Sequence, residues 1–312
     1  MKLTVILPCF NGAETIAVQM EALTRQHWPE GWEVVVVNNG STDRSMEIVE
    51  QYRGRLPSLR IAQAHVPGTP RLGVPHSYNT GIKVATGEAF VLCEADDEVA
   101  DGWLAAMGKA LSRHEFVVAR LEYRKLNAES IHPPYENGEG FQSKGVVTFR
   151  WARHVTAASL CGAGLRRSMV EKVGPLSTNF PIVHDAEYCW RAQVAGYTPH
   201  FEPEAVVHYR LRASARGRFI QGRNWGRDTT RLEWHYVGTK PFPAARHLIW
   251  MAAYVPRVVK PLVLFPFRPM KARQLLSEWI WQFGWSVGKL SAIVQRPRLR
   301  PASSQAASMP TH

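Results

Sequence analysis

The sequence predicts an α/β protein with a mostly parallel sheet flanked by helices. Two observations lead to this fold class. Through the first 120 residues, runs of apolar residues alternate with segments whose apolar residues recur at helical spacing. The run at 32–37 is too continuously apolar to leave one side in water, which is typical of parallel strands covered on both faces. With 312 residues, 45% of them hydrophobic and 21% charged, the chain is globular and long enough for one large domain or two smaller ones.

Five apolar runs are expected to be the strands. Each is five to seven residues long and contains Val, Ile or Leu, and the run WEVVVV is apolar almost throughout. The expected strands are residues 3–7, 32–37, 59–65, 89–93 and 115–121. A further strand is expected within EAVVHYRLR (204–212), and its end carries His208 and Arg210.

Four segments with helical periodicity connect or follow these strands. The first begins after the Asn11-Gly12 turn pair, the second has Ser41 or Thr42 as a candidate N-cap, and the third ends at Gly87. The expected helices are residues 13–26, 41–52, 76–87 and 100–113. The resulting alternation is the pattern of βαβ units.

Polar residues follow the expected strands at the edge where a ligand would bind. In open parallel sheets, ligands bind beyond the carboxyl ends of the strands. Glu94, Asp96 and Asp97 directly follow the fourth strand. Crowded carboxylates repel one another, so they occur on solvated loops or around a positive group. Their place at the predicted site favours Mg²⁺ or Mn²⁺, which prefers oxygen ligands and shares them with phosphates. The other strand ends at this edge are residues 8–11, 38–41 and 66–73.

Missing motifs argue against several function classes. No GxGxxG follows the first strand and no GxxxxGK[ST] is present, which disfavours dinucleotide-binding and P-loop enzymes. The four cysteines are far apart and form no CxxC pair, so we expect reduced core thiols in a cytosolic compartment rather than disulfides or zinc. The N-terminal apolar run is too short for a signal peptide, and no window of about 20 apolar residues predicts a membrane span.

Positive charge is concentrated in the C-terminal third. Residues 205–312 hold 18 Lys or Arg and 3 Asp or Glu, a net of +15, against −3 for residues 1–204. Residues 231–300 mix Trp, Leu and Phe with Arg and Lys, which is typical of amphipathic helices at an anionic membrane surface. Nucleic acid is a disfavoured partner, because its binding motifs are absent. A helical subdomain packed on the first domain or on a second copy stays open, and residues 301–312 are expected to be disordered.

Four stretches of the chain resemble the sequential motifs of family-2 glycosyltransferases. They occur in the family's order and are VILPCFNGAETI, VVVVNNGSTD, NTGIKVATGEAFVLCEADD and HDAEYCWRAQVAGY. The resemblance covers about residues 1–230, which are therefore expected to form a domain of the GT-A fold. It implies an inverting transfer of a sugar from a nucleotide-diphosphate donor to an acceptor hydroxyl, with Mg²⁺ or Mn²⁺ on the diphosphate.

The resemblance also implies which residues contact the donor nucleotide. Pro8, Asn11 and Glu14 match the family's first loop, which lies against the nucleotide. Asn38, with Gly40 in the same loop, matches a position that is usually an aspartate contacting the base. Asn keeps an acceptor oxygen and adds an NH₂ donor, so the preference for a base is expected to change.

The letters EAD after the fourth strand match the family's DxD motif, with Glu in place of the first Asp. Asp96 is the expected metal ligand, Glu94 is expected to reach ribose or metal less tightly, and Asp97 matches a following acid that is frequent in the family. His208 is a second expected metal ligand, because a His in this place can complete the metal site of related enzymes. Arg210 is expected to contact phosphate.

An inverting transfer needs a general base for the acceptor hydroxyl. Asp185 matches the second residue of an ED-like motif, where the family has its base, and is the expected catalytic residue. His184 replaces the preceding Glu of that motif and is a rival base. A helix N-cap is the alternative role for Asp185, and Glu187 is expected to orient its neighbours.

A lipid-linked or cell-envelope glycan is the expected acceptor, with the enzyme peripheral on the cytoplasmic face of a membrane; homo-oligomerisation stays open. Residues 128–145 are a candidate acceptor lid, and the small residues of LCGAG (160–164) are expected to let substrate approach the backbone. The departures at Asn38, Glu94 and His184 leave a second possibility, a non-catalytic descendant that binds a membrane or partner. A sugar nucleotidyltransferase is disfavoured, because LPCFNGAETI lacks a glycine-rich basic loop.

Overall fold

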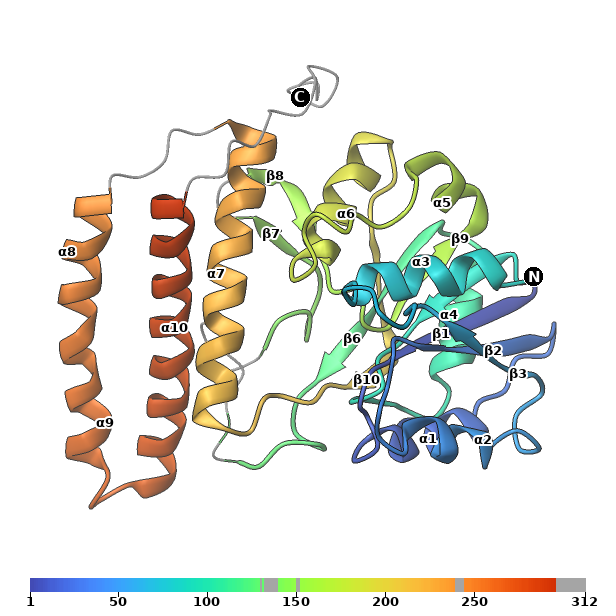
Figure 1. The fold of residues 1–312 in the computed structure, drawn as a ribbon, viewed down its shortest axis with the longest axis horizontal. Helices are drawn as coiled ribbons and strands as arrows, with labels where there is room; N and C mark the ends of the chain where they lie inside the picture. Colours follow the sequence, from blue (N-terminus) through green and yellow to red (C-terminus); the bar gives the residue numbers. More distant parts are fainter. Residues whose placement is uncertain (130, 132–139, 150–151, 239–243, 296–312) are drawn as a thin grey trace. The chain divides into compact units, whose positions relative to one another are not determined.

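The computed structural model describes residues 1–129, 131, 140–149, 152–238 and 244–295 (Figure 1). The chain divides into two compact units, the first comprising Met1–Glu122 and Gln142–Arg210, the second Tyr123–Phe141 and Leu211–His312. The expected disordered tail and much of the expected lid lie outside the described residues. The assignment of residues 1–230 to one functional domain and of residues 231–300 to a membrane-associated extension stays a prediction.

The described part of the first unit contains an eight-stranded sheet in the order β3-β2-β1-β4-β9-β6-β10-β5. Parallel pairs join β1 to β2 and β4, β2 to β3, and β6 to β10, while β4 and β6 both run antiparallel to β9. The carboxyl ends of these six parallel strands therefore lie along one edge, which confirms the predicted fold class. The strands are β1 (Leu3–Cys9), β2 (Trp32–Asn38), β3 (Leu59–Gln63), β4 (Ala89–Leu92), β5 (Glu98–Val99), β6 (Phe116–Glu122), β9 (Ala163–Arg166) and β10 (His200–His208).

The antiparallel strand β9 is not predicted by the sequence. It is four residues long and lies between β4 and β6. Two glycines here serve packing: a Cβ at Gly164, within β9, would lie 2.7 Å from Met107 Cε, and one at Gly162, just before β9, would lie 2.6 Å from Val207 Cγ2. The small residues of this segment thus face neighbouring side chains, so the prediction that they admit substrate to the backbone was wrong at these two glycines.

Helices cover the sheet, and Figure 1 shows α3 on one side of β1 to β3 with α1 and α2 on the other. A Cβ at Gly81 of α3 would overlap Cγ2 of Ile6, so a glycine is needed where this helix meets β1. The first unit also holds the hairpin of β7 (Val147–Phe149) and β8 (Ala152–Ala157). Its helices are α1 (Ile16–Thr24), α2 (Ser45–Glu50), α3 (Val74–Val84), α4 (Trp103–Leu111), α5 (Arg167–Val173) and α6 (His184–Val194).

The second unit is helical over most of its described residues. It contains α7 (Ala215–Val237), α8 (Ala244–Tyr254), the 3₁₀ turn η1 (Val255–Val258), α9 (Val259–Leu264) and α10 (Pro269–Gln295). Two pairs of glycines bring α7 and α10 into backbone contact: Gly222 and Gly226 on α7, and Gly284 and Gly288 on α10. Among the described residues, no helix combines the length and the apolar character that a membrane crossing requires.

Replacing Gly226 by Val should destabilise the second unit. A Cβ at this position overlaps the backbone carbonyl oxygen of Trp285, and a helix backbone cannot move aside as a flexible side chain can. Overpacking of this kind costs about 1–3 kcal/mol, so urea unfolding followed by circular dichroism should show a lower midpoint. The control is Gly54→Ala, where an added Cβ meets nothing within 4 Å, so the urea midpoint should equal that of wild type. An unchanged midpoint for Gly226→Val would contradict the close packing.

Candidate functional site

The loops that follow β1 and β2 are tied together by short polar side chains. The Oδ1 atom of Asn11 accepts a hydrogen bond from the Thr42 backbone N–H at 2.8 Å, and the Asn11 N–H donates to Ser41 Oγ at 3.1 Å. Asn11 has a φ of 48°, a left-handed conformation that Asn tolerates better than most residues. Asn38 Oδ1 accepts from the Ser41 N–H at 2.8 Å. These contacts bring Asn11 and Asn38 together around Ser41, at the carboxyl-end edge of the sheet.

Ser41 and Thr42 do not cap the following helix, so the N-cap predicted at these residues was wrong. α2 begins at Ser45, and the Ser45 backbone N–H donates to Asp43 Oδ1 at 3.0 Å. The other carboxylate oxygen of Asp43 accepts from the Ala13 N–H at 3.0 Å, which adds a further bridge between the two loops. The hydroxyl of Ser41 and the backbone of Thr42 are engaged with Asn11 instead.

The loop after β3 joins the same edge. Gly40 has a φ of 79°, and a Cβ there would lie 2.5 Å from His65 Cδ2, so only glycine allows the two loops to approach. Asn39 Nδ2 donates to the Leu72 carbonyl at 2.7 Å. The guanidinium of Arg71 lies over the Phe10 ring, 3.2 Å from its centroid. Pro8, at the end of β1, is half-buried, and Glu14 is exposed at the start of the segment that leads into α1.

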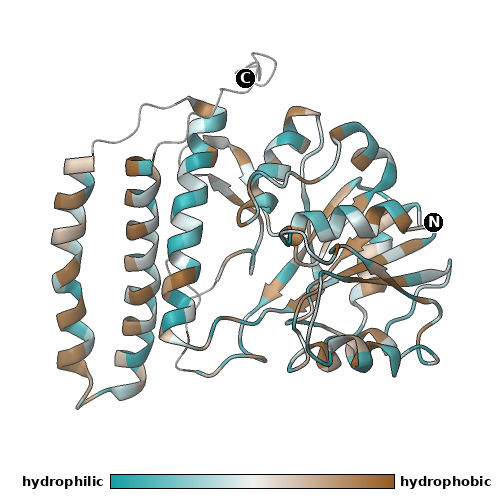
Figure 2. Ribbon diagram, in the orientation of Figure 1, coloured by the Kyte–Doolittle hydropathy of each residue, from teal (hydrophilic) through white to brown (hydrophobic). Residues whose placement is uncertain are grey.

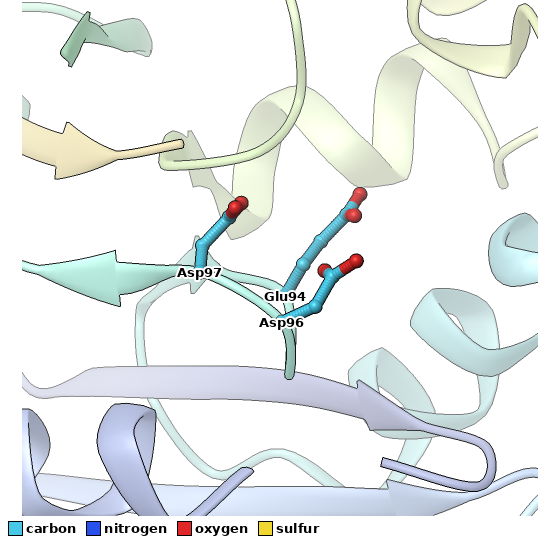
Figure 3. A group of neighbouring side chains, drawn as sticks. All are labelled: Glu94, Asp96 and Asp97. Carbon is cyan, nitrogen blue, oxygen red and sulfur yellow. The ribbon is translucent and has the colours of Figure 1, made fainter. Parts of the chain in front are cut away.

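The three carboxylates after β4 lie together (Figure 3), with one oxygen of each within 4.8 Å of the others. Asp97 is 1% exposed, whereas Glu94 and Asp96 are half-buried. Asp97 accepts from the Arg210 backbone N–H at 2.7 Å and from Cys161 Sγ at 2.8 Å. Burial, helped by the neighbouring charge of Asp96, raises the pKa of Asp97 to about 8. Hard oxygen donors clustered in this way fit a divalent cation such as Mg²⁺ or Mn²⁺.

Two basic residues lie at the end of β10, of which Arg210 contacts the acidic loop. Among the described residues, the three carboxylates form a group of possible metal ligands that does not include His208. Arg210 Nε donates to the Asp96 backbone carbonyl at 2.7 Å, which holds its guanidinium beside the acidic loop. His208 Nδ1 lies 2.8 Å from Glu122 Oε2 at the end of β6. Because a carboxylate accepts, Nδ1 carries the proton, and in the neutral ring Nε2 keeps its lone pair. This is the arrangement in which metal-binding histidines are commonly oriented.

Asp185 lies in the first turn of α6. Val183 occupies the N-cap position, so the alternative in which Asp185 caps the helix was wrong. Asp185 Oδ1 accepts from the Ala186 N–H at 2.7 Å, and burial raises the pKa of the carboxyl. His184 is 8% exposed and its Nδ1 lies 3.1 Å from the Pro181 carbonyl. Glu187 pairs with Arg191 Nε at 2.7 Å, which fits the prediction that it orients neighbours.

Sequence reasoning missed several residues that hold this edge together. Glu122 and Cys161 are each far from their partners in the sequence and belong to apolar segments that are typical of a core. The Arg71–Phe10 contact joins two loops whose only signal was their place at strand ends. Asp43 falls within a predicted helix, whereas in the structure it precedes α2 and accepts from the Ser45 N–H.

Ligands of mostly parallel sheets bind at the edge where these carboxylates lie, and comparison with known proteins gives the family. The model of "Glycosyl transferase family 2" matches residues 4–174, more than half of the chain. The chain therefore belongs to glycosyltransferase family 2, and the predicted family is confirmed.

Curated relatives are named as sugar transferases. "Glycosyltransferase AglE" of Haloferax volcanii is 27% identical over 206 residues, 65% of each chain. "Uncharacterized glycosyltransferase YibD" of Escherichia coli is 38% identical over 99 residues, 31% of this chain and 27% of its own. "Poly(ribitol-phosphate) beta-N-acetylglucosaminyltransferase TarS" of Staphylococcus aureus is 30% identical over 136 residues, 42% of this chain and 22% of its own. The chain thus spans between 22% and 65% of the length of these relatives.

Solved structures support the fold. The mannosyltransferase PcManGT of Pyrobaculum calidifontis, in complex with GDP-Man and Mn²⁺, superposes with a TM-score of 0.59 at 20% identity, covering 92% of this chain and 86% of its own. S. aureus TarS 1–349 in complex with UDP gives 0.52 at 17% identity, covering 96% and 93%. At these identities the likeness establishes the GT-A fold.

Proposed function

We propose that this protein is an inverting glycosyltransferase that moves a sugar from a nucleotide-diphosphate donor to an acceptor hydroxyl. The observation that carries the proposal is the trio of Glu94, Asp96 and Asp97 at the carboxyl end of β4 in a family-2 chain. Neighbours of the same fold bind GDP-Man with Mn²⁺ and UDP, which supports a nucleoside diphosphate with either kind of base. Pro8, Asn11, Glu14, Asn38 and Gly40 are the proposed nucleotide contacts.

Mg²⁺ or Mn²⁺ is the proposed cofactor, and when bound it neutralises charge on the diphosphate. Asp96 is its proposed ligand, with His208 as the second and Glu94 nearby. Asp97 acts differently, because its two oxygens are engaged with the Arg210 N–H and Cys161 and so fix the end of β10 against the acidic loop. The guanidinium of Arg210, held by the backbone of Asp96, is placed to bind a phosphate of the leaving nucleotide.

Asp185 is the proposed general base. Its pKa is raised by burial, and a carboxylate of higher pKa takes a hydroxyl proton more readily. The contact with the Ala186 N–H orients one oxygen, leaving the other for the acceptor. His184, tied to the Pro181 carbonyl, is the rival base, and substitution of each residue separates the two.

The proposed acceptor is a lipid-linked or cell-envelope glycan, with the enzyme peripheral on the cytoplasmic face of a membrane. Support comes from a relative named for transfer to poly(ribitol-phosphate) and from the basic, apolar character of residues 231–300. The assignment of acceptor and location is separate from that of the donor and can fail without it.

The proposed function is tested by incubating the protein with UDP-, GDP- and dTDP-sugars, Mn²⁺ and candidate glycan acceptors. Release of nucleoside diphosphate that depends on acceptor is the expected result, and proton NMR of the product should show an inverted anomeric configuration. If no nucleotide sugar is consumed and none binds, the protein is a non-catalytic descendant instead.

Glu122→Ala is expected to weaken Mn²⁺ binding by about 10- to 100-fold, because partners that orient a metal-binding imidazole typically contribute that much. Glu122 Oε2 contacts His208 Nδ1 and so fixes the tautomer in which Nε2 can be the ligand, and alanine removes this acceptor. Calorimetric titration with Mn²⁺ measures the effect without turnover. The matched control is Glu115→Ala at an exposed acid just before β6, which should bind Mn²⁺ as wild type does. Equal Mn²⁺ affinity in Glu122→Ala and wild type would show that Glu122 does not support the metal site.

A further inference from the structure

The segment α8–η1–α9 has two apolar sides, and one of them packs within the second unit. Tyr254 stacks on Trp279 of α10, with ring centroids 6.3 Å apart and planes 8° from parallel. His247, 5% exposed, has its Nε2 2.9 Å from the Ser286 carbonyl of the same helix. Tyr254 and Pro261 are buried on this side as well. The orientation of the segment on α10 is therefore settled by specific contacts.

The other side is apolar and open, and we call it the outer stripe: Leu248, Ile249, Val255, Val259, Leu262 and Val263. The spacings between successive members are one, six, four, three and one positions, and at 3.6 residues per turn all six fall on one face of the nearly continuous helix. Ile249 is 71% exposed, Leu262 60% and Val263 61%. A water-facing helix side is normally polar. Figure 2 shows the contrast: α8 and α9 are mainly brown, whereas α7 is mainly teal.

The outer stripe continues into the turn that precedes α10. Phe265 is 50% exposed and Phe267 81% in this turn, and Met270, in the first turn of α10, is 42% exposed. Phe265 and Phe267 directly follow α9, and exposed large apolar side chains gathered in this way mark interaction sites. Exposed phenylalanine rings at one end of the stripe can insert between lipid headgroups, which a rigid protein surface would not allow.

The charges around the outer stripe have a single sign. Arg257, Lys260, Arg268 and Lys271 are all exposed, and residues 244–277 contain no Asp or Glu. At 3.6 residues per turn, Lys260 falls beside the stripe, whereas Arg257 lies further round the helix, with its guanidinium over the Tyr254 ring, 4.9 Å from the centroid. A partner that binds here must therefore present an apolar surface to the stripe and negative charge to the basic residues around it. A second copy would bring two basic faces together, which like-charge repulsion opposes.

We propose that the outer stripe and the following turn form a docking surface for an anionic lipid bilayer. The apolar side chains enter the boundary between headgroups and acyl chains, and the flanking Arg and Lys bind headgroup phosphates. The lack of a membrane-crossing helix among the described residues agrees with a segment that lies in the interface. Binding to lipid does not depend on the proposed function. Only its purpose rests on that function, and this purpose is access to a lipid-linked acceptor.

The test is flotation of the full chain with phosphatidylcholine vesicles, with and without about one third phosphatidylglycerol. Wild type should float with anionic vesicles, and less at high salt. The apolar variant Ile249→Ser/Val263→Ser/Phe267→Ser should lose roughly tenfold or more of its partitioning. The charge variant Arg257→Gln/Lys260→Gln/Lys271→Gln should lose a similar amount. Matched controls are Val84→Ser/Val194→Ser and Lys83→Gln/Lys109→Gln, exposed residues of the first unit, which should float as wild type does.

Circular dichroism of each variant separates lost docking from lost folding, and these exposed side chains should leave the spectrum unchanged. The proposal is overturned if folded wild type ignores anionic vesicles. It is also overturned if wild type is a dimer without lipid that the apolar variant converts to a monomer, because a second copy then covers the stripe. Titration of nucleotides on the same preparations distinguishes the two proposals. Nucleotide binding without flotation overturns the docking surface alone, and flotation without nucleotide binding overturns the proposed function alone.

Discussion

Asp185→Asn is expected to lower turnover by about two to four orders of magnitude, the usual contribution of a general base. The amide keeps the size of the side chain and an acceptor for the Ala186 N–H, so the fold of α6 should remain. It cannot take a proton from the acceptor hydroxyl. Affinity for the donor nucleotide, measured by calorimetry, should stay near the wild-type value, so the loss should fall on turnover.

The pH profile gives this prediction a second readout. The base works when ionised, and because burial raises the pKa of Asp185, turnover of wild type should rise with pH through that raised value. In Asp185→Asn the same rise should be absent. His184→Gln is the matched control and should keep both most of the turnover and the pH dependence. If His184→Gln loses more activity than Asp185→Asn, the base is the imidazole and the assignment is wrong.

Asp96→Asn is expected to lose Mn²⁺ binding by about 100-fold or more, because a carboxylate ligand of a hard cation supplies both charge and oxygen donors. Asp96 is half-buried in the acidic cluster, whereas Asp97 is buried and engaged with Arg210 and Cys161. Paramagnetic resonance of free Mn²⁺ measures binding directly. Nucleoside diphosphate should then fail to bind in the presence of Mn²⁺.

Two substitutions make this result specific. Glu94→Gln should weaken Mn²⁺ binding less than Asp96→Asn does, because Glu94 is the longer and less tightly placed carboxylate. Asp101→Asn removes the same charge from an exposed acid paired with Arg25 and should leave Mn²⁺ affinity unchanged. Equal losses in all three variants would show a diffuse electrostatic effect and contradict a ligand role for Asp96.

The parallel core of the fold could be predicted because the continuously apolar composition of its strands indicates burial on both faces. VVVV of β2 is buried without alternation, and the four strand–helix repeats follow in order. The place of the acidic cluster followed from the rule that ligand sites lie at the carboxyl ends of parallel strands. Asp185 and the nucleotide loops, by contrast, came from the family resemblance.

What could not be predicted depends on contacts between distant residues. β9 has four residues and runs against the direction of its neighbours, so no local period marks it. Ser41 could cap a helix or bridge to a neighbouring loop, because short polar side chains do both. In the folded protein Ser41 and Thr42 bind Asn11, contacts that depend on residues 30 and 31 positions apart. Cys161 has the apolar context of a core thiol, yet it donates to Asp97 from a separate segment.

The central claim, that the edge around Glu94 and Asp96 is a donor site, is tested most directly by calorimetric titration of UDP, GDP and dTDP into wild type, with and without Mn²⁺. Binding of one nucleotide that requires Mn²⁺, and that disappears in Asp96→Asn, is the predicted result. Absence of binding for all three nucleotides with folded protein and saturating Mn²⁺, or binding that Asp96→Asn leaves intact, would contradict the claim.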